Sequence, residues 1–219
     1  MKNEFCDKYL EQINGPFAGI NLTRINSAEE FYYKQYLDSI KPFEELDSLK
    51  KIYAKSKIHV DIGFGGGFPL LPLASINPEK KYIGFEARGK KSKVVNQIAE
   101  ALELDNVKTY HQRFENVYFD RDAVVTFKAV STIEKLLPLF ITDKTLYVVF
   151  YKGPNFYELE DLDDLSRDWE IVDETLVDMP ETDGRMIIVL KNKKVLHGTM
   201  VRQAKKKTNK NLVSLSEFL

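Results

Sequence analysis

Short apolar runs and amphipathic stretches alternate along most of the chain. The apolar, β-branched-rich runs have the length of buried strands, and apolar residues recur at helical spacing between several of them. The predicted strands cover residues 58–62, 81–86, 107–111, 123–127, 146–151, 169–175 and 185–190. The intervening predicted helices cover residues 70–76, 90–104 and 133–140. Alternating strands and helices predict an α/β fold with a parallel sheet. The last two strands are joined by a short turn, which predicts one antiparallel pair.

The beginning and the end of the chain differ from this alternation. Residues 1–56 have helical spacing, with one helix from Phe31 to Ile40 that we expect Pro42 to end, and another over residues 43–53. We therefore predict three parts. They are an N-terminal helical extension (1–56), a sheet domain (57–192) and a basic C-terminal tail (193–219).

A glycine-rich stretch, Val60 to Pro69, lies between the first predicted strand and its helix. Glycine there allows a sharp turn and the close approach of a ligand. A dinucleotide site requires Gly-x-Gly-x-x-Gly, but Phe68 occupies the third glycine position. Pro69 and Pro72 also remove two N–H donors from the beginning of the helix, where a pyrophosphate would bind. An NAD-dependent oxidoreductase is therefore disfavoured.

The spacing of Asp61, Gly63, Gly65 and Gly67 instead resembles the first motif of class I S-adenosylmethionine-dependent methyltransferases. Glu86 ends the next predicted strand, 23 residues after Gly63. An acidic residue about 20 residues after such a turn can accept hydrogen bonds from the ribose hydroxyls. We assign these five residues to cofactor binding.

Composition restricts the size, the compartment and the charge distribution that we expect for this protein. The chain has 219 residues, of which 43% are hydrophobic, so one sizeable α/β domain can bury a full core. No signal peptide or transmembrane run is evident, and the single cysteine, Cys6, excludes a disulfide framework. We expect a cytoplasmic monomer with no membrane contact and no metal. The net charge of −1 conceals an acidic segment, residues 158–174, and a basic one, residues 202–210.

Several further stretches resemble one family, the small-subunit (16S) rRNA guanine-N7 methyltransferases, also called glucose-inhibited division protein B. Besides the glycine turn, the matching stretches are Asn21-Leu22-Thr23, Leu37-Asp38-Ser39, Arg88-Gly89-Lys90-Lys91, Leu104 to Val107, Arg113-Phe114-Glu115 and Tyr151-Lys152-Gly153. The resemblance covers about residues 10–190. It implies a Rossmann-like class I fold with a mostly parallel seven-stranded sheet and S-adenosylmethionine as the cofactor.

The resemblance also implies individual roles. Gly63 and Phe68 would line the cofactor pocket, and Phe114 and Glu115 would flank the adenine, partly through backbone groups. The family's Ser-Arg-Ala appears here as Phe127-Lys128-Ala129, so Lys128 replaces an arginine that contacts the cofactor. Lysine keeps the charge but lacks the planar guanidinium fork.

The expected chemistry requires no general base. N7 of guanine is an unprotonated ring nitrogen that can attack the methyl group directly, so catalysis would come from positioning. The sequence has neither an Asn-Pro-Pro-Tyr motif nor a cysteine after the fourth strand, as other base methylations would require. We assign no residue a purely catalytic role, although Lys128 is a candidate for positioning.

RNA contact is expected at the basic residues beside the pocket. Arg88, Lys90 and Lys91 begin a helix, where cations oppose the helix dipole, so phosphate binding explains them better than helix propensity. Asn21 and Thr23 would shape the substrate side of the pocket. The expected partner is 16S rRNA in the small ribosomal subunit.

Two alternatives remain open from the sequence. One is a methyltransferase for another substrate, which the basic residues around Arg88 disfavour. The other is a non-catalytic RNA-binding or ribosome-assembly protein on a methyltransferase fold, for which Lys128 is the best support and Glu86 the main counter-argument.

Overall fold

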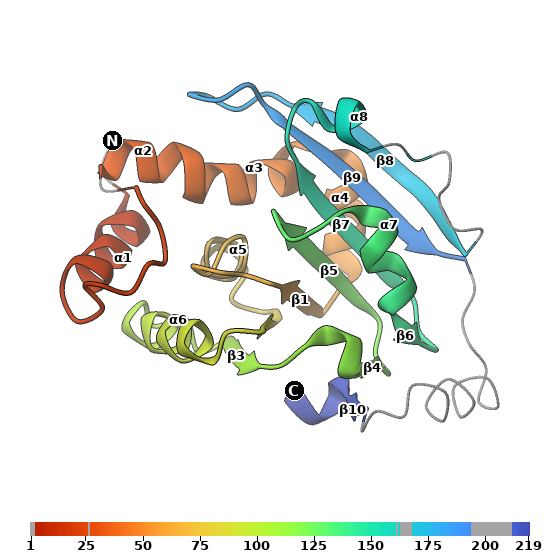
Figure 1. Ribbon diagram of the computed structural model, residues 1–219, viewed down its shortest axis with the longest axis horizontal. Coiled ribbons are helices and arrows are strands. Elements are labelled where there is room, and N and C mark those ends of the chain that lie inside the picture. Colours follow the sequence, from red (N-terminus) through yellow and green to blue (C-terminus); the bar gives the residue numbers. More distant parts are fainter. Residues whose placement is uncertain (1–2, 26, 161, 163–167, 194–211) are drawn as a thin grey trace.

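A computed structural model of the chain describes residues 3–25, 27–160, 162, 168–193 and 212–219 (Figure 1). The α-helices are α1 (Glu4–Asn14), α2 (Ala28–Phe31), α3 (Asp38–Glu45), α4 (Asp47–Lys55), α5 (Leu70–Ile76), α6 (Gly89–Ala101), α7 (Ile133–Leu136) and α8 (Phe156–Leu159). A π-helix, η1 (Tyr32–Leu37), joins α2 to α3, and the 3₁₀ helices are η2 (Phe114–Asn116), η3 (Leu137–Leu139) and η4 (Leu215–Phe218). The strands are β1 (Ile58–Ile62), β2 (Lys81–Glu86), β3 (Val107–His111), β4 (Val117–Phe119), β5 (Ala123–Lys128), β6 (Ile141–Thr142), β7 (Leu146–Lys152), β8 (Trp169–Val177), β9 (Arg185–Asn192) and β10 (Val213–Ser214).

The central sheet has the topology predicted from the sequence. Its seven strands lie in the order β3-β2-β1-β5-β7-β9-β8. The first five of these are parallel, and β9 is antiparallel to both β7 and β8. This is the class I methyltransferase arrangement. It brings the carboxyl ends of β1, β2 and β5 together at one edge of the sheet, where ligands of α/β proteins bind.

Each face of the sheet carries its own hydrophobic core. One face packs against α1 to α6, including Leu70 to Ala74 of α5 and Val94 to Ala99 of α6. The other face packs against α7, α8 and the 3₁₀ helices. None of the helices in the described ranges is long and apolar enough to cross a membrane.

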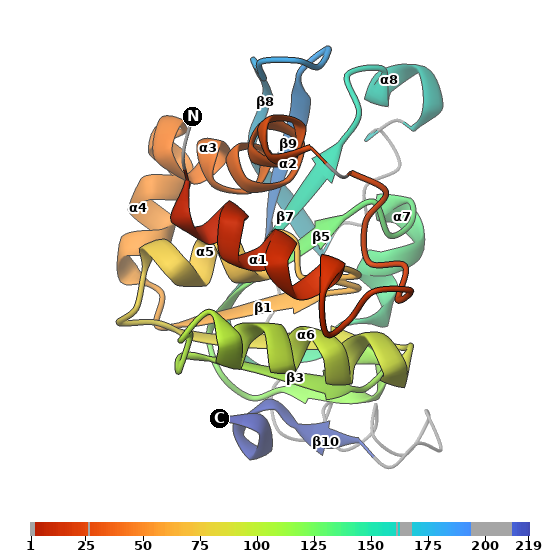
Figure 2. The same cartoon turned by 90° about the vertical axis from the view of Figure 1, so that its left-hand side faces the viewer.

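The N-terminal helices cover the same face as α5 and α6, as Figure 2 shows for α1. The prediction that Pro42 ends a helix is wrong, because α3 continues through Pro42 to Glu45. Proline removes one backbone donor, but Ile40, Pro42 and Phe43 are all buried, and this packing offsets the loss. The following helix begins at Asp47 rather than residue 43, because Leu46 has an extended backbone.

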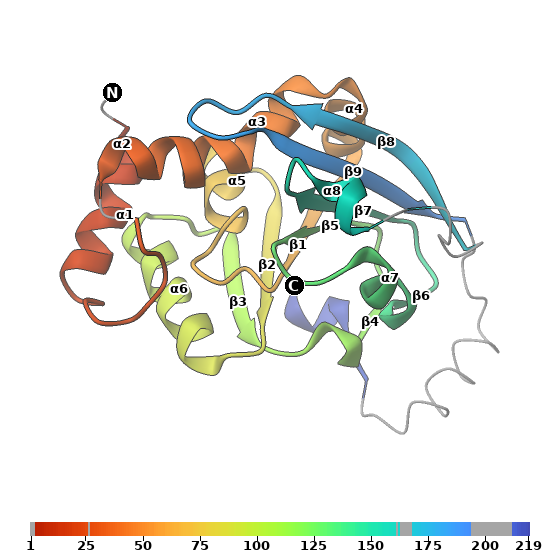
Figure 3. The same ribbon diagram turned by 45° about the horizontal axis from the view of Figure 1, so that its top comes forward.

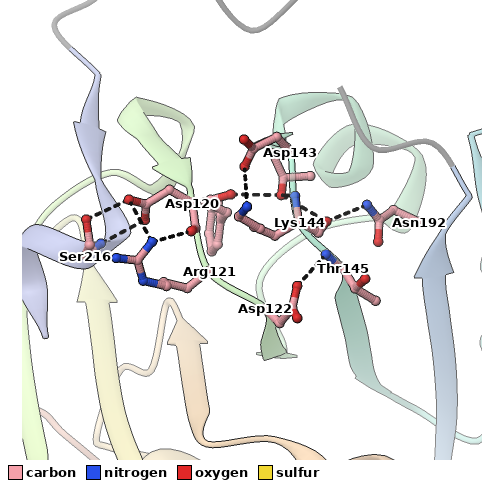
Figure 4. Close-up of polar contacts among 10 residues, drawn as sticks. Asp120, Arg121, Asp122, Asp143, Lys144, Thr145, Asn192 and Ser216 are labelled. Atoms are coloured by element: carbon pink, nitrogen blue, oxygen red, sulfur yellow. Dashed lines mark hydrogen bonds and ion pairs between the residues drawn. The ribbon is translucent and has the colours of Figure 1, made fainter. Parts of the chain in front are cut away.

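The last eight residues of the expected tail pack onto the domain. Strand β10 joins β4 and β6 in a second sheet (Figure 1), and Leu215 is fully buried. Figure 3 shows this C-terminal segment beside β4. Asp120 fixes this segment, since its carboxylate accepts hydrogen bonds from the backbone N–H (2.9 Å) and the hydroxyl (2.6 Å) of Ser216 (Figure 4). This packing could not be predicted from the sequence, because strands of two or three residues carry no periodicity. The basic residues 202–210 lie outside the described residues.

Candidate cofactor and RNA site

The glycine turn follows β1 at the carboxyl edge of the sheet, as predicted. Gly63, Gly65 and Gly67 have φ angles of +71°, +56° and +96°, which residues with a Cβ rarely adopt. The turn is tied to the neighbouring strand, because the Gly63 N–H donates to the Phe85 carbonyl at 2.8 Å. A Cβ placed on Gly65 would meet no heavy atom nearer than 3.9 Å, so this part of the turn presents an open backbone surface.

Glu86 lies directly beside this turn. One carboxylate oxygen accepts from the Gly65 N–H at 3.1 Å, and the other accepts from the Arg88 N–H at 3.0 Å. The side chain is buried, with 9% of the residue exposed. Each oxygen keeps a further lone pair, so the fixed carboxylate can still accept from the hydroxyls of a ribose.

Asp61 lies in the core beneath the turn and does not face a ligand. It is fully buried, and its carboxylate accepts from the Leu70 N–H at 2.9 Å, which fixes the beginning of α5. Burial raises the pKa of Asp61 to about 7, although the hydrogen bond from Leu70 and the charge of Lys128 oppose this shift. The position of Asp61 therefore indicates that it shapes the site through the backbone.

The N-terminal extension contacts the turn directly, which the sequence analysis did not foresee. The buried hydroxyl of Tyr9 donates to the Gly66 carbonyl at 2.6 Å. A Cβ on Gly66 would come within 2.8 Å of the Leu22 carbonyl oxygen, so glycine is required there for space. The stretch Asn21-Leu22-Thr23 thus lies against the glycine turn. The Thr23 hydroxyl makes a local contact, since it accepts from the Ile25 N–H.

Two aromatic residues expected at the pocket have their rings in the core. Phe68 is 6% exposed and packs against Tyr9 and Phe31, with ring centroids 5.2 and 5.5 Å away. Phe114 is equally buried, and its ring contacts Phe127. Backbone groups are therefore the part of Phe114 that can reach an adenine, whereas the half-buried side chain of Glu115 remains accessible.

Lys128 ends β5 at the same edge, as predicted, but its ammonium is already paired. It lies 2.6 Å from a carboxylate oxygen of Asp38, and the other oxygen of Asp38 lies 2.8 Å from Nε of Arg185. Asp38 belongs to one of the stretches noted in the sequence. Arg185 was missed, because nothing in its local sequence distinguishes it from a solvated charge at the beginning of a strand.

The predicted basic RNA-binding residues follow Glu86, which is hydrogen-bonded to the turn. Arg88 and Lys90 are exposed and Lys91 is half-buried, all at the beginning of α6 and immediately after Glu86. Among the residues that the structure describes, none forms an ion pair with these three cations, and Asn21 is also exposed. The group is therefore available to phosphates beside the cofactor turn.

Comparisons with known proteins identify the family independently of this geometry. The model of the family described as rRNA small subunit methyltransferase G matches residues 2–188. A Lactobacillus acidophilus protein named ribosomal RNA small subunit methyltransferase G is 30% identical over 90% of this chain and 84% of its own length. A Lactobacillus johnsonii protein of the same name is 33% identical over 84% of this chain and 81% of its own.

Among solved structures, a mutant of MtNAS superimposes with a TM-score of 0.58 at 12% identity, over 85% of this chain and 70% of that chain. At this identity the likeness concerns the fold alone. The family match extends over the N-terminal helices and most of the sheet, and it includes the glycine turn, Glu86 and Lys128. The chain belongs to the rRNA small subunit methyltransferase G family.

Proposed function

We propose that this protein transfers a methyl group from S-adenosylmethionine to N7 of a guanine in 16S rRNA of the small ribosomal subunit. The observation that carries the proposal is the open glycine turn with Glu86 fixed beside it. Membership of the rRNA small subunit methyltransferase G family supports both the reaction class and the type of substrate.

The residues at the turn fit S-adenosylmethionine. The left-handed conformation of Gly65 leaves room for an adenosine against the backbone, and the Glu86 carboxylate is placed for the ribose hydroxyls. When bound, this cofactor supplies an activated methyl group on its sulfonium. Phe68 stands where a dinucleotide-binding turn requires its third glycine, which weighs against a nicotinamide cofactor.

The chain has to position the acceptor nitrogen rather than deprotonate it. N7 of guanine already carries an in-plane lone pair, so alignment of nitrogen, methyl and sulfur supplies most of the rate enhancement. The strand end that faces the turn carries Lys128 and no carboxylate or imidazole of its own. Arg88, Lys90 and Lys91 would hold the RNA backbone while the base enters from the side of Asn21 and Thr23.

A methyl-transfer assay tests this function. The protein is incubated with radiolabelled S-adenosylmethionine and small subunits or 16S rRNA from a strain that lacks this methyltransferase, and the RNA is digested to nucleosides. We expect labelled 7-methylguanosine with the wild-type protein and its loss with Glu86→Ala or Gly63→Asp. Glu100→Ala, which changes an exposed acid of α6, is the matched control and should retain activity.

Binding measurements, made together with the transfer assay, distinguish the alternatives. Cofactor binding by calorimetry without transfer to RNA would indicate another methyl acceptor. A protein that binds 16S rRNA but not S-adenosylmethionine would be a non-catalytic assembly protein, and the proposed reaction would be rejected.

A further inference from the structure

Three charged side chains from distant parts of the chain meet beside the glycine turn. Asp38 comes from α3, Lys128 from the end of β5 and Arg185 from the beginning of β9. The carboxylate of Asp38 uses one oxygen for the Lys128 ammonium (2.6 Å) and the other for Nε of Arg185 (2.8 Å). Asp38 is 1% exposed, and 12% of the Lys128 side chain is exposed, so water screens the cluster little.

The two cations have different constraints. Arg185 is held a second time, because its Nη1 donates to the Lys152 carbonyl at 3.4 Å. In the described part of the chain, by contrast, the Lys128 ammonium forms an ion pair with Asp38 and no hydrogen bond of good geometry. An ammonium has three donors. Lys128 therefore keeps unused donors inside a nearly closed site.

The Lys128 ammonium also faces the glycine turn. It lies 5.9 Å from the ring centroid of Phe68, which belongs to the turn. Val130, two residues after Lys128, packs on the turn, since a Cβ on Gly63 would come within 2.8 Å of its side chain. Ala129 between them has a left-handed φ of +56°, a strained conformation of the kind that concentrates at functional sites.

We infer that Asp38 and Arg185 are positioning residues that hold the ammonium of Lys128 at the carboxyl end of β5, facing the cofactor turn. The inference rests on the proposed function, because Lys128 matters only if the turn is the reacting site. A lysine side chain has four rotatable bonds, and it stays in one orientation only when an opposite charge fixes it.

Arg185 is needed for a geometric reason. A carboxylate that binds a single cation can rotate about its terminal bond and release its partner. With the second oxygen held by Arg185, the first oxygen of Asp38 stays beside the Lys128 ammonium. The cluster carries two positive charges and one negative charge. This leaves a net charge of +1 for an electronegative group of the cofactor or the base.

The ionisation of the cluster agrees with this role. Burial alone would raise the pKa of Asp38, but the charges of Lys128 and Arg185 bring it below its usual value. Burial lowers the pKa of Lys128, and the charge of Asp38 opposes that shift. Removal of the Asp38 charge therefore removes the larger of two carboxylate charges that oppose burial, the other being Asp61, and weakens the hold on the proton of Lys128.

The first test observes Lys128 directly, without cofactor or RNA. In the isotope-labelled wild-type protein, the ammonium signal of Lys128, assigned by its absence from Lys128→Met, should exchange slowly with water. Asp38→Asn should abolish this protection, and Arg185→Gln should reduce it. Asp120→Asn changes a carboxylate on Ser216 at the opposite edge of the sheet, and the Lys128 signal should not respond to it (Figure 4). An unprotected Lys128 in the wild type, or full protection in folded Asp38→Asn, would overturn the inference.

The second test is a double-mutant cycle on methyl transfer. Lys128→Met and Asp38→Asn should each lower kcat/KM by about tenfold or more, and the double variant should be no worse than Lys128→Met alone. A merely structural role of Asp38 would instead give multiplied losses that follow the loss of stability in urea, and that result would refute the inference. If Asp38→Asn does not fold, Arg185→Gln takes its place in the cycle.

The two proposals can fail separately. A wild-type protein that binds no S-adenosylmethionine contradicts the proposed function, while the exchange measurement on Lys128 still decides whether Asp38 and Arg185 hold this ammonium.

Discussion

The hydroxyl group of Tyr9 connects the N-terminal helices to the cofactor turn through one hydrogen bond. It is fully buried and donates to the Gly66 carbonyl at 2.6 Å. Tyr9→Phe removes this donor and leaves the ring packed against Phe31 and Phe68. The variant therefore tests the contact with little change in the packing of the core.

The magnitude follows from the burial of both partners. A typical hydrogen bond contributes about 1 kcal/mol net, and a buried carbonyl without a partner costs about 1–3 kcal/mol. We expect Tyr9→Phe to lower the free energy of unfolding by about 1–3 kcal/mol. In a chain of 219 residues, each kcal/mol lowers Tm by about 2–4 °C.

Cofactor affinity should fall as well, because the turn loses the contact that fixes Gly66. The loss of binding free energy can be no larger than the free energy needed to reorder the turn when the cofactor binds. The Kd for S-adenosylmethionine should therefore rise by about tenfold for each 1.4 kcal/mol spent on reordering the turn. Urea denaturation measures the stability, and isothermal titration calorimetry measures the affinity.

Tyr53→Phe provides the matched control. Its buried hydroxyl meets that of Tyr82, which also donates to the Leu73 carbonyl at 2.9 Å, away from the cofactor turn. This control should lose stability without a change in Kd. Equal weakening of cofactor binding by both variants, or an unchanged Kd and stability in Tyr9→Phe, would refute the reasoning.

Three further perturbations test other parts of the structure. Gly84→Ala places a Cβ 2.6 Å from ring atoms of Phe64, so we expect a destabilisation of about 1–3 kcal/mol in thermal melts; an unchanged Tm would contradict this packing. Burial raises the pKa of Asp61 in the folded protein to about 7. The unfolded chain releases this proton near pH 4, so the stability of the folded protein falls as pH rises from about 4 to about 7. Urea titrations at several pH values should show that Asp61→Asn loses this fall, which can reach about 1.4 kcal/mol per pH unit. In filter-binding assays, Lys90→Gln should weaken RNA binding and reduce the slope of the logarithm of the binding constant against the logarithm of salt concentration by about one. Lys55→Gln, at the other edge of the sheet, is the control and should change neither the affinity nor the slope.

The sequence by itself determined the parts of this protein that depend on local pattern. Apolar runs separated by amphipathic stretches specified the central strands and their connections, and the turn from Gly63 to Pro69 marked the cofactor edge. Strand ends are also local features. The positions of Glu86 and Lys128 at that edge therefore followed from their places at the ends of predicted strands.

Only the tertiary structure decided which groups meet at that edge. The bond from Tyr9 to Gly66 spans 57 positions, and the pair of Asp38 and Arg185 spans 147. Such contacts produce no periodic pattern in the sequence, because they depend on how α1, α3 and β9 pack rather than on neighbours in the chain. For the same reason, burial decided that α3 continues through Pro42 and that residues 212–219 return to the domain. Local propensity favours or disfavours an element by at most a few kcal/mol, and the burial of apolar side chains in a shared core outweighs it.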